Sequence, residues 1–272
     1  MRTGAGRLAR ISAAIAAAAL LAACSGDQLL TTNTLTADIS AAPGGAYGAG
    51  GEPKAQPFNP FHDGTPTDYG RREVMVNPTL GDVLKTGPLP ERSVGRADAP
   101  VTVIKYASLT CPYCRRFQAT VFPAFKRDYI DTGKVRFIVR EFPIGRSSGN
   151  ATIALRCAPA SQYFALYGKF LDRQANWVSQ EVRIDKIHAV AAESGLSRAE
   201  FDACLKNQDL IAGLKWVKDR GRKLGIIGTP NFYIQNTLVK KVLDYGDLKA
   251  LVDAELAAGT AGTAGTSMAV AN

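Results

Sequence analysis

Two cysteines, Cys111 and Cys114, lie three positions apart directly after an apolar run, within the stretch SLTCPYCRRF (residues 108–117). Such a pair could supply half of a zinc site, form a structural disulfide or work as a redox pair. Zinc needs four ligands, usually Cys or His. The chain has only two histidines, His62 and His188, and no second Cys-X-X-Cys, so a metal site is not predicted. A disulfide across one helical turn closes a very small loop and constrains little of the unfolded chain, which argues against a purely structural role.

The redox interpretation explains each residue of the motif. Pro112 suits the first position of a helix, which makes Cys111 the expected N-cap. There its sulfur can accept backbone N–H groups and lies at the positive end of the helix dipole, and both effects favour the attacking thiolate. Cys114, one turn further on, is shielded and can attack a mixed disulfide formed at Cys111. We therefore predict that Cys111 is the nucleophile and Cys114 the resolving thiol, and we expect no cofactor.

The N-terminal residues resemble a bacterial export signal. Arg2 to Arg10 form a basic segment, and residues 11–23 form an alanine-rich apolar segment too short to span a bilayer comfortably. The sequence LAAC (residues 21–24) resembles a lipobox, in which Cys24 would be lipidated and become the mature N-terminus. Ordinary signal cleavage after one of the alanines is the alternative. Lipidation of Cys24 would leave four of the five cysteines, which can pair without remainder in an oxidising compartment.

The composition is that of a globular protein, with 46% hydrophobic and 21% charged residues. The formal net charge is +9. The 33 basic residues less the three arginines of the leader leave 30 against 24 acidic residues, a net charge of +6. Since no Arg and Lys stripe is interleaved with aromatic residues, nucleic acid is not an expected partner.

The elements that would position the cysteine pair follow an α/β order. Buried or short strands are expected at 101–107, 135–142, 231–235 and 238–243. Helices are expected over 112–130, several times within 150–224, and from about Asp247. Pro123 should kink the first of these helices, and Ser197 with Glu200 should form a capping box within the helical stretch.

Three segments carry a resemblance to a known family. They are APVTVIKYASLTCPYCRRF, VRFIVREFPI and GIIGTPNFYIQ, and they resemble the DsbA-like branch of the thioredoxin-fold thiol–disulfide oxidoreductases over about Ser93 to Leu256. The resemblance implies a thioredoxin fold with an all-helical domain inserted between the second and third of the expected strands. It also implies that Pro230 is a cis-proline facing the cysteine pair and that Thr229 offers backbone to a client peptide. Pro112 and Tyr113 would line the same client site.

Two residues depart from the pattern of this family. Tyr113 stands where the best-known oxidants carry histidine, so Cys111 should be less acidic and the protein a milder oxidant. Lys105 stands six residues before Cys111, where relatives commonly place an acid. A buried Lys105 would need a carboxylate partner, for which Glu141 on the neighbouring strand is the candidate. The alternative is that the Lys105 ammonium reaches water.

Cys157 and Cys204 each lie on an apolar helical face. They could be two core thiols, but an oxidising compartment favours a disulfide between them. This bond would stabilise the helical insertion and take no part in the reaction.

The predicted function is exchange of disulfides with exported, cysteine-containing proteins by a periplasmic, membrane-anchored lipoprotein. In the oxidant version, a DsbB-like membrane partner reoxidises the pair. The CPYC sequence is also similar to that of DsbG and the glutaredoxins, so a reductase or isomerase kept reduced by a DsbD-like partner stays open. A holdase or a copper carrier that uses the two thiols is the alternative from another class. The sequence does not indicate the oligomeric state.

The predicted organisation has six parts, which follow one another along the chain. They are a signal peptide (1–23), a lipid-anchored flexible tether that is partly helical (24–90), the first half of the thioredoxin fold (91–145), the helical insertion (146–226), the second half of the fold (227–256) and a disordered tail (257–272).

Overall fold

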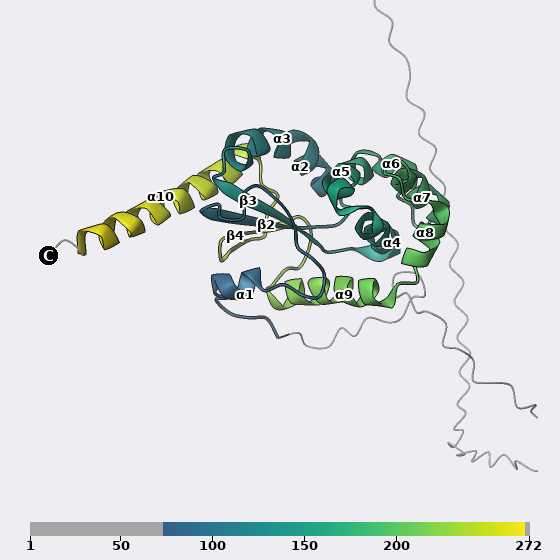
Figure 1. Cartoon of the computed structure of the whole chain (residues 1–272), viewed down its shortest axis with the longest axis horizontal. Helices are drawn as coiled ribbons and strands as arrows, with labels where there is room; N and C mark the ends of the chain where they lie inside the picture. The colour runs from purple at the N-terminus through teal and green to yellow at the C-terminus, as the bar shows by residue number, and fades with distance from the viewer. Residues whose placement is uncertain (1–72, 270–272) are drawn as a thin grey trace, which may run out of the picture. The chain divides into compact units, whose positions relative to one another are not determined.

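The computed structural model describes residues 73–269, with side chains through residue 259. Its centre is a five-stranded sheet in the order β1-β3-β2-β4-β5 (Figure 1). The parallel pair β2–β3 forms the middle of the sheet, and the other neighbours are antiparallel. The strands are β1 (Arg92–Val94), β2 (Val101–Ala107), β3 (Val135–Glu141), β4 (Asn231–Ile234) and β5 (Thr237–Val239).

Strand β2 is buried along its whole length, as its β-branched and apolar sequence VTVIKYA predicts. Alternate residues face opposite sides of the sheet. Val103 belongs to the cluster under α2 (Pro112–Thr120), whereas Ile104 and Tyr106 belong to the cluster under α1 (Leu80–Leu84). Lys105 lies two residues after Val103 on the same strand, so its side chain also lies on the α2 side of the sheet.

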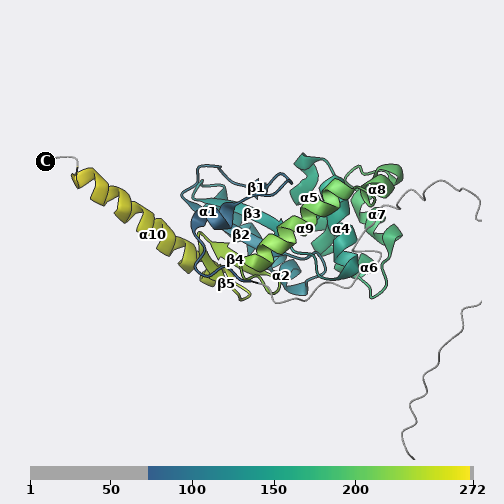
Figure 2. The same cartoon turned by 90° about the horizontal axis from the view of Figure 1, so that it is seen from below.

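Helices cover both faces of the sheet. On one face lie α2, α3 (Phe122–Phe125), a π-helical turn (Lys126–Ile130) and the start of α10 (Tyr245–Ala269). On the other face lie α1 and α9 (Gln208–Lys223), which follow one another across the sheet (Figure 2). The expected kink is confirmed, since the helix predicted over 112–130 breaks at Val121, two residues before Pro123.

Apart from α9, which lies on a face of the sheet, the helical insertion that follows β3 gathers beyond one end of the sheet, opposite the end from which α10 leaves (Figures 1 and 2). The expected capping box at Ser197 and Glu200 is present at the start of α8. The inserted elements are α4 (Gly145–Cys157), a 3-10 turn (Ala160–Gln162), α5 (Tyr163–Asp172), α6 (Gln174–Trp177), α7 (Ile184–Ala192), α8 (Arg198–Cys204) and α9.

The structure differs from the sequence-based expectations at the two edges of the fold. Strand β1 was not predicted, because three residues give too short a pattern to show alternation. Helix α10 continues to Ala269, so the prediction of a disordered tail from residue 257 is wrong for residues 257–269. Alanine has the highest helix propensity, and it recurs through this segment. The helical part expected in the tether is confirmed by α1.

The predicted signal peptide, Cys24 and most of the predicted tether lie outside the described residues. Within residues 73–269, no helix combines the length and the apolar character needed to cross a bilayer.

Candidate active site

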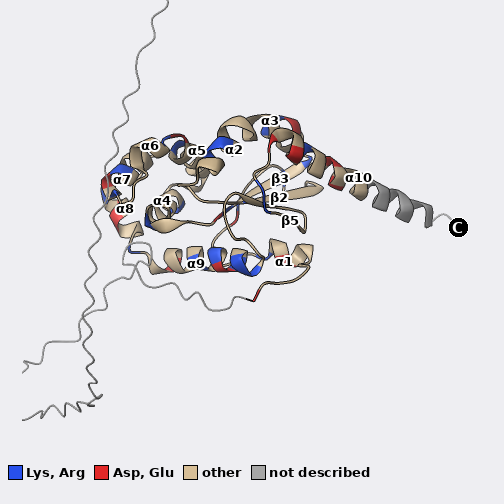
Figure 3. Ribbon diagram, turned by 180° about the vertical axis from the view of Figure 1, so that it is seen from behind, with Lys and Arg blue, Asp and Glu red and all other residues tan. Residues whose placement is uncertain are grey.

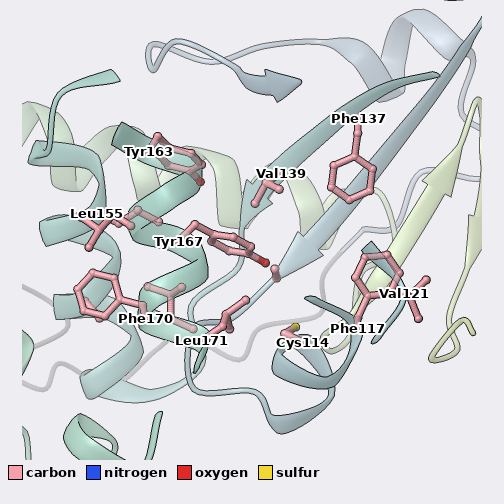
Figure 4. Packing of buried hydrophobic residues seen from close by; sticks show 14 of the residues in the cluster. Cys114, Phe117, Val121, Phe137, Val139, Leu155, Tyr163, Tyr167, Phe170 and Leu171 are labelled. Atoms are coloured by element: carbon pink, nitrogen blue, oxygen red, sulfur yellow. The ribbon is translucent and has the colours of Figure 1, made fainter. Parts of the chain in front are cut away.

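The cysteine pair lies at the start of α2, directly after β2. Cys111 is the N-cap residue, with extended backbone angles (φ −77°, ψ 120°), and Pro112 opens the helix as expected. Cys111 is half-buried, whereas Cys114 is fully buried against the core. Figure 4 shows Cys114 one turn before Phe117 on α2, with Tyr167 approaching from α5. One sulfur is therefore open to a partner and the other is shielded.

A loop from the far end of the chain faces Cys111. The Thr229–Pro230 peptide bond is cis, as the resemblance implied. The Cys111 thiol donates a hydrogen bond to the Thr229 carbonyl oxygen at 3.1 Å. Pro230 is buried and Thr229 is half-buried, and β4 begins at the next residue. The pairing of β2 with β4 thus brings Cys111 and Thr229, which are 118 positions apart in sequence, into contact.

The pKa of Cys111 is lowered to about 5. The largest cause is a hydrogen bond donated by the Cys114 thiol, and the Thr229 side chain and the backbone N–H groups of Cys114 and Tyr113 add to it, while burial opposes them. Among the described residues, Cys111 accepts no full N-cap hydrogen bond. The N–H groups at the helix start therefore act on the sulfur as oriented dipoles, in the direction expected from the sequence.

The pKa of Cys114 is shifted in the opposite direction, well above its ordinary value. Burial is the main cause, and donation of its proton to Cys111 adds to it. Around neutral pH the structure therefore favours a thiolate at Cys111 beside a thiol at Cys114. This is the arrangement expected of a nucleophile and a resolving thiol.

The predicted pairing of Lys105 with Glu141 is wrong. Glu141 accepts two hydrogen bonds from the Arg156 guanidinium, one of them at 2.7 Å, and a further one from the Tyr163 hydroxyl at 2.7 Å. In the parallel register Lys105 lies opposite Val139, two residues before Glu141, and Arg156 from α4 reaches the carboxylate instead. Only the tertiary packing of α4 brings that arginine to this strand.

The alternative for Lys105 is also wrong, since its side chain is fully buried and does not reach water. Its ammonium lies over the ring of Phe117, 4.3 Å from the centroid, and 5.5 Å from the centroid of Tyr167. Burial lowers the pKa of Lys105 to about 8, while the sulfurs of Cys114 and Cys111 act in the opposite direction.

Gln174 is a site residue that the sequence analysis missed. Its side-chain amide is buried and donates hydrogen bonds to the carbonyl oxygens of Leu109 (2.7 Å) and Cys111 (3.0 Å). It therefore fixes the loop that delivers Cys111 to the helix start. No pattern in the sequence could have identified it, because it lies 63 residues from Cys111 in the inserted helices.

Several apolar side chains lie exposed on the segments around Cys111. Tyr113 is 53% exposed, Ile144 is 49% exposed and Ile227 is 79% exposed. The Ile144 carbonyl accepts a hydrogen bond from Thr110, next to Cys111, and Ile227 precedes the cis-proline loop by two residues. Exposed apolar side chains grouped around a reactive group are typical of a surface that binds another molecule.

The remaining cysteines form a disulfide. Cys157 at the end of α4 is bonded to Cys204 at the end of α8, with a Cα–Cα distance of 6.2 Å. The bond joins two helices of the insertion. In the described part of the chain, no group of three or more His, Cys, Asp and Glu side chains is placed to hold a metal ion.

Fold and site together define a class. A mixed sheet with a Cys-X-X-Cys pair at the start of α2, a cis-proline loop opposite it and a helical insertion characterises a DsbA-like thioredoxin fold. The thioredoxin family matches residues 89–254, and the chain belongs to that family.

Relatives in sequence agree with this class. A Rickettsia typhi protein named as a protein-disulfide oxidoreductase is 30% identical over 146 residues, which cover 52% of this chain and 53% of the relative. The chain therefore spans about half the length of this relative. Disulfide bond formation protein D of Bacillus subtilis is 25% identical over 168 residues, 60% of this chain and 76% of the relative.

Solved structures show the same fold. Alpha-DsbA1 of Wolbachia pipientis superposes with a TM-score of 0.61 at 25% sequence identity, over 68% of this chain and 100% of that one. Oxidised BdbD of Bacillus subtilis superposes with a TM-score of 0.55 at 22% identity, a likeness of fold. The chain is thus a member of the thioredoxin family with a DsbA-like fold.

Proposed function

We propose that this protein is a thiol–disulfide oxidoreductase that introduces disulfides into exported proteins through Cys111 and Cys114. The observation that carries the proposal is that the pKa values of the two sulfurs are shifted in opposite directions. Cys111 is accessible and its pKa is lowered to about 5, whereas Cys114 is buried and its pKa is raised well above its ordinary value. A purely structural disulfide would need neither an accessible sulfur nor a stabilised thiolate.

The reaction needs only these two sulfurs and a client dithiol. A client thiolate attacks the Cys111 sulfur, a client–Cys111 bond forms, and the bond between Cys111 and Cys114 breaks with its electron pair on Cys114. A second client thiolate then attacks the first client sulfur, which forms the client disulfide and releases Cys111 as a thiolate. The client has lost two electrons and the protein has gained them.

The stabilised thiolate supports the oxidant direction. A stable thiolate makes Cys111 the better leaving group and lowers the free energy of the reduced protein relative to the disulfide. A pKa of about 5 lies between the values typical of a reducing thioredoxin, roughly 7, and of a strongly oxidising DsbA, roughly 3.5. This intermediate position supports the milder oxidant predicted from Tyr113.

The surface around Cys111 suits an extended, partly apolar client segment. The Thr229 backbone lies beside the sulfur, and Tyr113, Ile144 and Ile227 expose apolar surface around it. Helix α2 carries basic and no acidic residues in its first turns (Figure 3). A client segment with apolar side chains and without basic residues next to its cysteine therefore fits best.

The leader and the lipobox-like sequence support a location in the bacterial periplasm, with Cys24 holding the protein to a membrane by its lipid. A membrane protein of the DsbB type would then reoxidise the pair, and a DsbD-type protein would reduce it if the electrons flow in the other direction. Membrane fractionation of the wild type and Cys24→Ala tests the anchor. Release of the variant into the soluble fraction is expected, and equal membrane binding of both would refute it.

The direction is decided by the equilibrium between Cys111–Cys114 and glutathione. An oxidant is expected to be reduced by millimolar glutathione and to reoxidise a reduced client faster than it reduces insulin. A pair that stays oxidised under those conditions and reduces insulin readily would instead indicate the reductase or isomerase. Client protection that persists in Cys111→Ser/Cys114→Ser would show a holdase.

A further inference from the structure

Two arginines, Arg115 and Arg116, directly follow Cys114 along α2, and both side chains are exposed (Figure 3). In the described part of the chain, neither guanidinium has a hydrogen-bond or ion-pair partner. Other exposed arginines of the fold bind an aspartate close in sequence, as Arg96 and Arg127 do. The two positive charges beside the cysteine pair are therefore available to a bound molecule.

The helix directs both side chains toward its start, where the reactive sulfur lies. Arg115 follows Cys111 by four residues, and its backbone N–H donates a hydrogen bond to the Cys111 carbonyl oxygen at 3.2 Å. Residues three or four apart share a face of a helix, and a long side chain leans over the turn on its N-terminal side. Arg116 has this relation to Tyr113, three residues before it. The guanidinium groups therefore border the place where a client bonded to Cys111 lies.

A third arginine lies on the helix that begins beside the cysteine loop. Arg146 is exposed in the first turn of α4, which contains no acidic residue. The carbonyl oxygen of Ile144, the residue before this helix, accepts a hydrogen bond from Thr110 at 3.3 Å, so α4 begins next to the loop that leads to Cys111. The carboxylate of Glu141, which precedes this helix, is buried in its own ion pair. Positive charge thus borders Cys111 on two elements.

Building on the proposed function, we propose that Arg115 and Arg116 select client segments that carry an aspartate or glutamate close to the reacting cysteine. A guanidinium binds a carboxylate through two parallel hydrogen bonds, a geometry that neither a neutral nor a basic client side chain can use. An extended segment rises about 3.3 Å per residue, so a carboxylate one or two residues from the client cysteine stays within reach of an arginine side chain at the helix start.

Binding of the carboxylate also activates the client thiol. A carboxylate beside a cysteine raises the pKa of that thiol, because a second negative charge nearby is disfavoured. Such a client holds less thiolate near neutral pH and reacts slowly with an uncharged disulfide. An arginine that pairs with the carboxylate offsets this repulsion, and the thiol proton passes to solvent. The client thiolate then attacks the Cys111 sulfur, the client–Cys111 bond forms, and the Cys111–Cys114 bond breaks with its electron pair on Cys114.

The test compares three dithiol peptides that differ only in the residue beside each cysteine, which is Asp, Asn or Lys. The oxidised protein is mixed with each peptide at neutral pH and low ionic strength, and the second-order rate constant of peptide oxidation is measured. The Asp peptide should react about fivefold faster than the Asn peptide, the upper end for an exposed ion pair, and the Lys peptide should react slowest. The neutral reference, bis(2-hydroxyethyl) disulfide, should give the opposite order.

A charge reversal makes the test specific for the two arginines. Arg115→Glu/Arg116→Glu should fold, because both positions are exposed and glutamate and arginine have similar helix propensities. This variant should oxidise the Lys peptide faster than the Asp peptide. The ratio of rates between peptides cancels any effect of the substitutions on Cys111 itself, so a merely structural role would not reverse the order.

Lys206→Glu/Lys215→Glu is the matched control, since it changes the net charge by the same amount at exposed positions on α9 and just before it. It should keep the order of the wild type. A reversal in this control as large as in Arg115→Glu/Arg116→Glu would assign the preference to the net charge of the protein and overturn the proposal.

Salt provides a second readout on the unchanged protein. The ratio of the Asp to the Asn rate should fall toward one in about 1 M salt, where the Debye length is about 3 Å. A ratio that does not change with salt would contradict recognition by exposed charges.

The outcomes also separate this inference from the proposed function. If the oxidised protein oxidises none of the three peptides, the proposed function fails. If it oxidises all three in the order given by the neutral disulfide, only the role of the two arginines fails.

Discussion

Replacing Cys114 by alanine removes the hydrogen bond that contributes most to the low pKa of Cys111. The thiol of Cys114 is the donor, and its proton is held there by burial. Replacement by serine keeps a donor at the same position, because a hydroxyl group also donates to an anion. The two variants share one loss, the ability to form the disulfide, and differ only in the hydrogen bond to Cys111.

The size of the effect follows from the strength of such a bond. A hydrogen bond to a charged group contributes about 1.5–3 kcal/mol, and one pKa unit corresponds to about 1.36 kcal/mol. Because Cys111 is half-exposed, solvent screening reduces this contribution. We expect the pKa of Cys111 to rise by about one unit in Cys114→Ala and to stay near that of the wild type in Cys114→Ser.

The assay is the absorbance of the thiolate near 240 nm as a function of pH, with the alkylation rate of Cys111 by iodoacetamide as a second readout. Both variants contain one thiol in the site, so the signal belongs to Cys111. Equal pKa values in the two variants would show that the helix start and Thr229 alone stabilise the thiolate. The causes assigned to the low pKa would then be wrong.

The same pKa shift predicts how stability depends on pH. The pKa of Cys111 is lower in the folded than in the unfolded chain, so its contribution is fully present above the unfolded pKa and is lost as the pH falls toward 5. Between pH 5 and pH 8, the free energy of unfolding of Cys114→Ser should rise by about 2 kcal/mol relative to that of Cys111→Ser/Cys114→Ser. This value is half of the full linkage contribution, because solvent screens the half-exposed sulfur. Urea unfolding measures the difference, and a pH-independent difference would contradict it.

Three further predictions concern the surroundings of the pair. Thr229→Val should raise the pKa of the nucleophilic thiol by less than Cys114→Ala does, as measured by thiolate absorbance, because it removes a smaller contribution. Replacing Cys157 and Cys204 by alanine should lower the free energy of unfolding by up to about 4 kcal/mol, from a sequence separation of 47, and leave the glutathione equilibrium unchanged. Arg156→Met should lower the free energy of unfolding in urea by about 3–5 kcal/mol, since it leaves the buried Glu141 carboxylate without its ion-pair partner. The additional change Glu141→Leu should restore most of this loss. No recovery in the double variant would refute the pairing.

Local sequence determines the reactive end of the site. Cys111, Pro112 and Cys114 are close in sequence, so a strand followed by a helix start sets their spacing along the chain. The strands β2 and β3 were predictable for a similar reason, because long apolar and β-branched runs have few alternatives in a chain of this composition.

Residues far apart in sequence were beyond this kind of argument. Strand alternation could place Lys105 on one face of the sheet, but it could not show that α4 brings Arg156 to Glu141 and leaves the lysine without a carboxylate. Gln174 reaches the backbone of Cys111 only because the inserted helices pack back onto the site.

The sequence by itself thus determined which atoms can react and the family of folds that presents them. The tertiary structure decided which charges meet in the interior, because buried pairing depends on which helices pack together and not on spacing along one strand. That is why the redox pair could be identified from ten residues, whereas the partner of a single buried lysine could not.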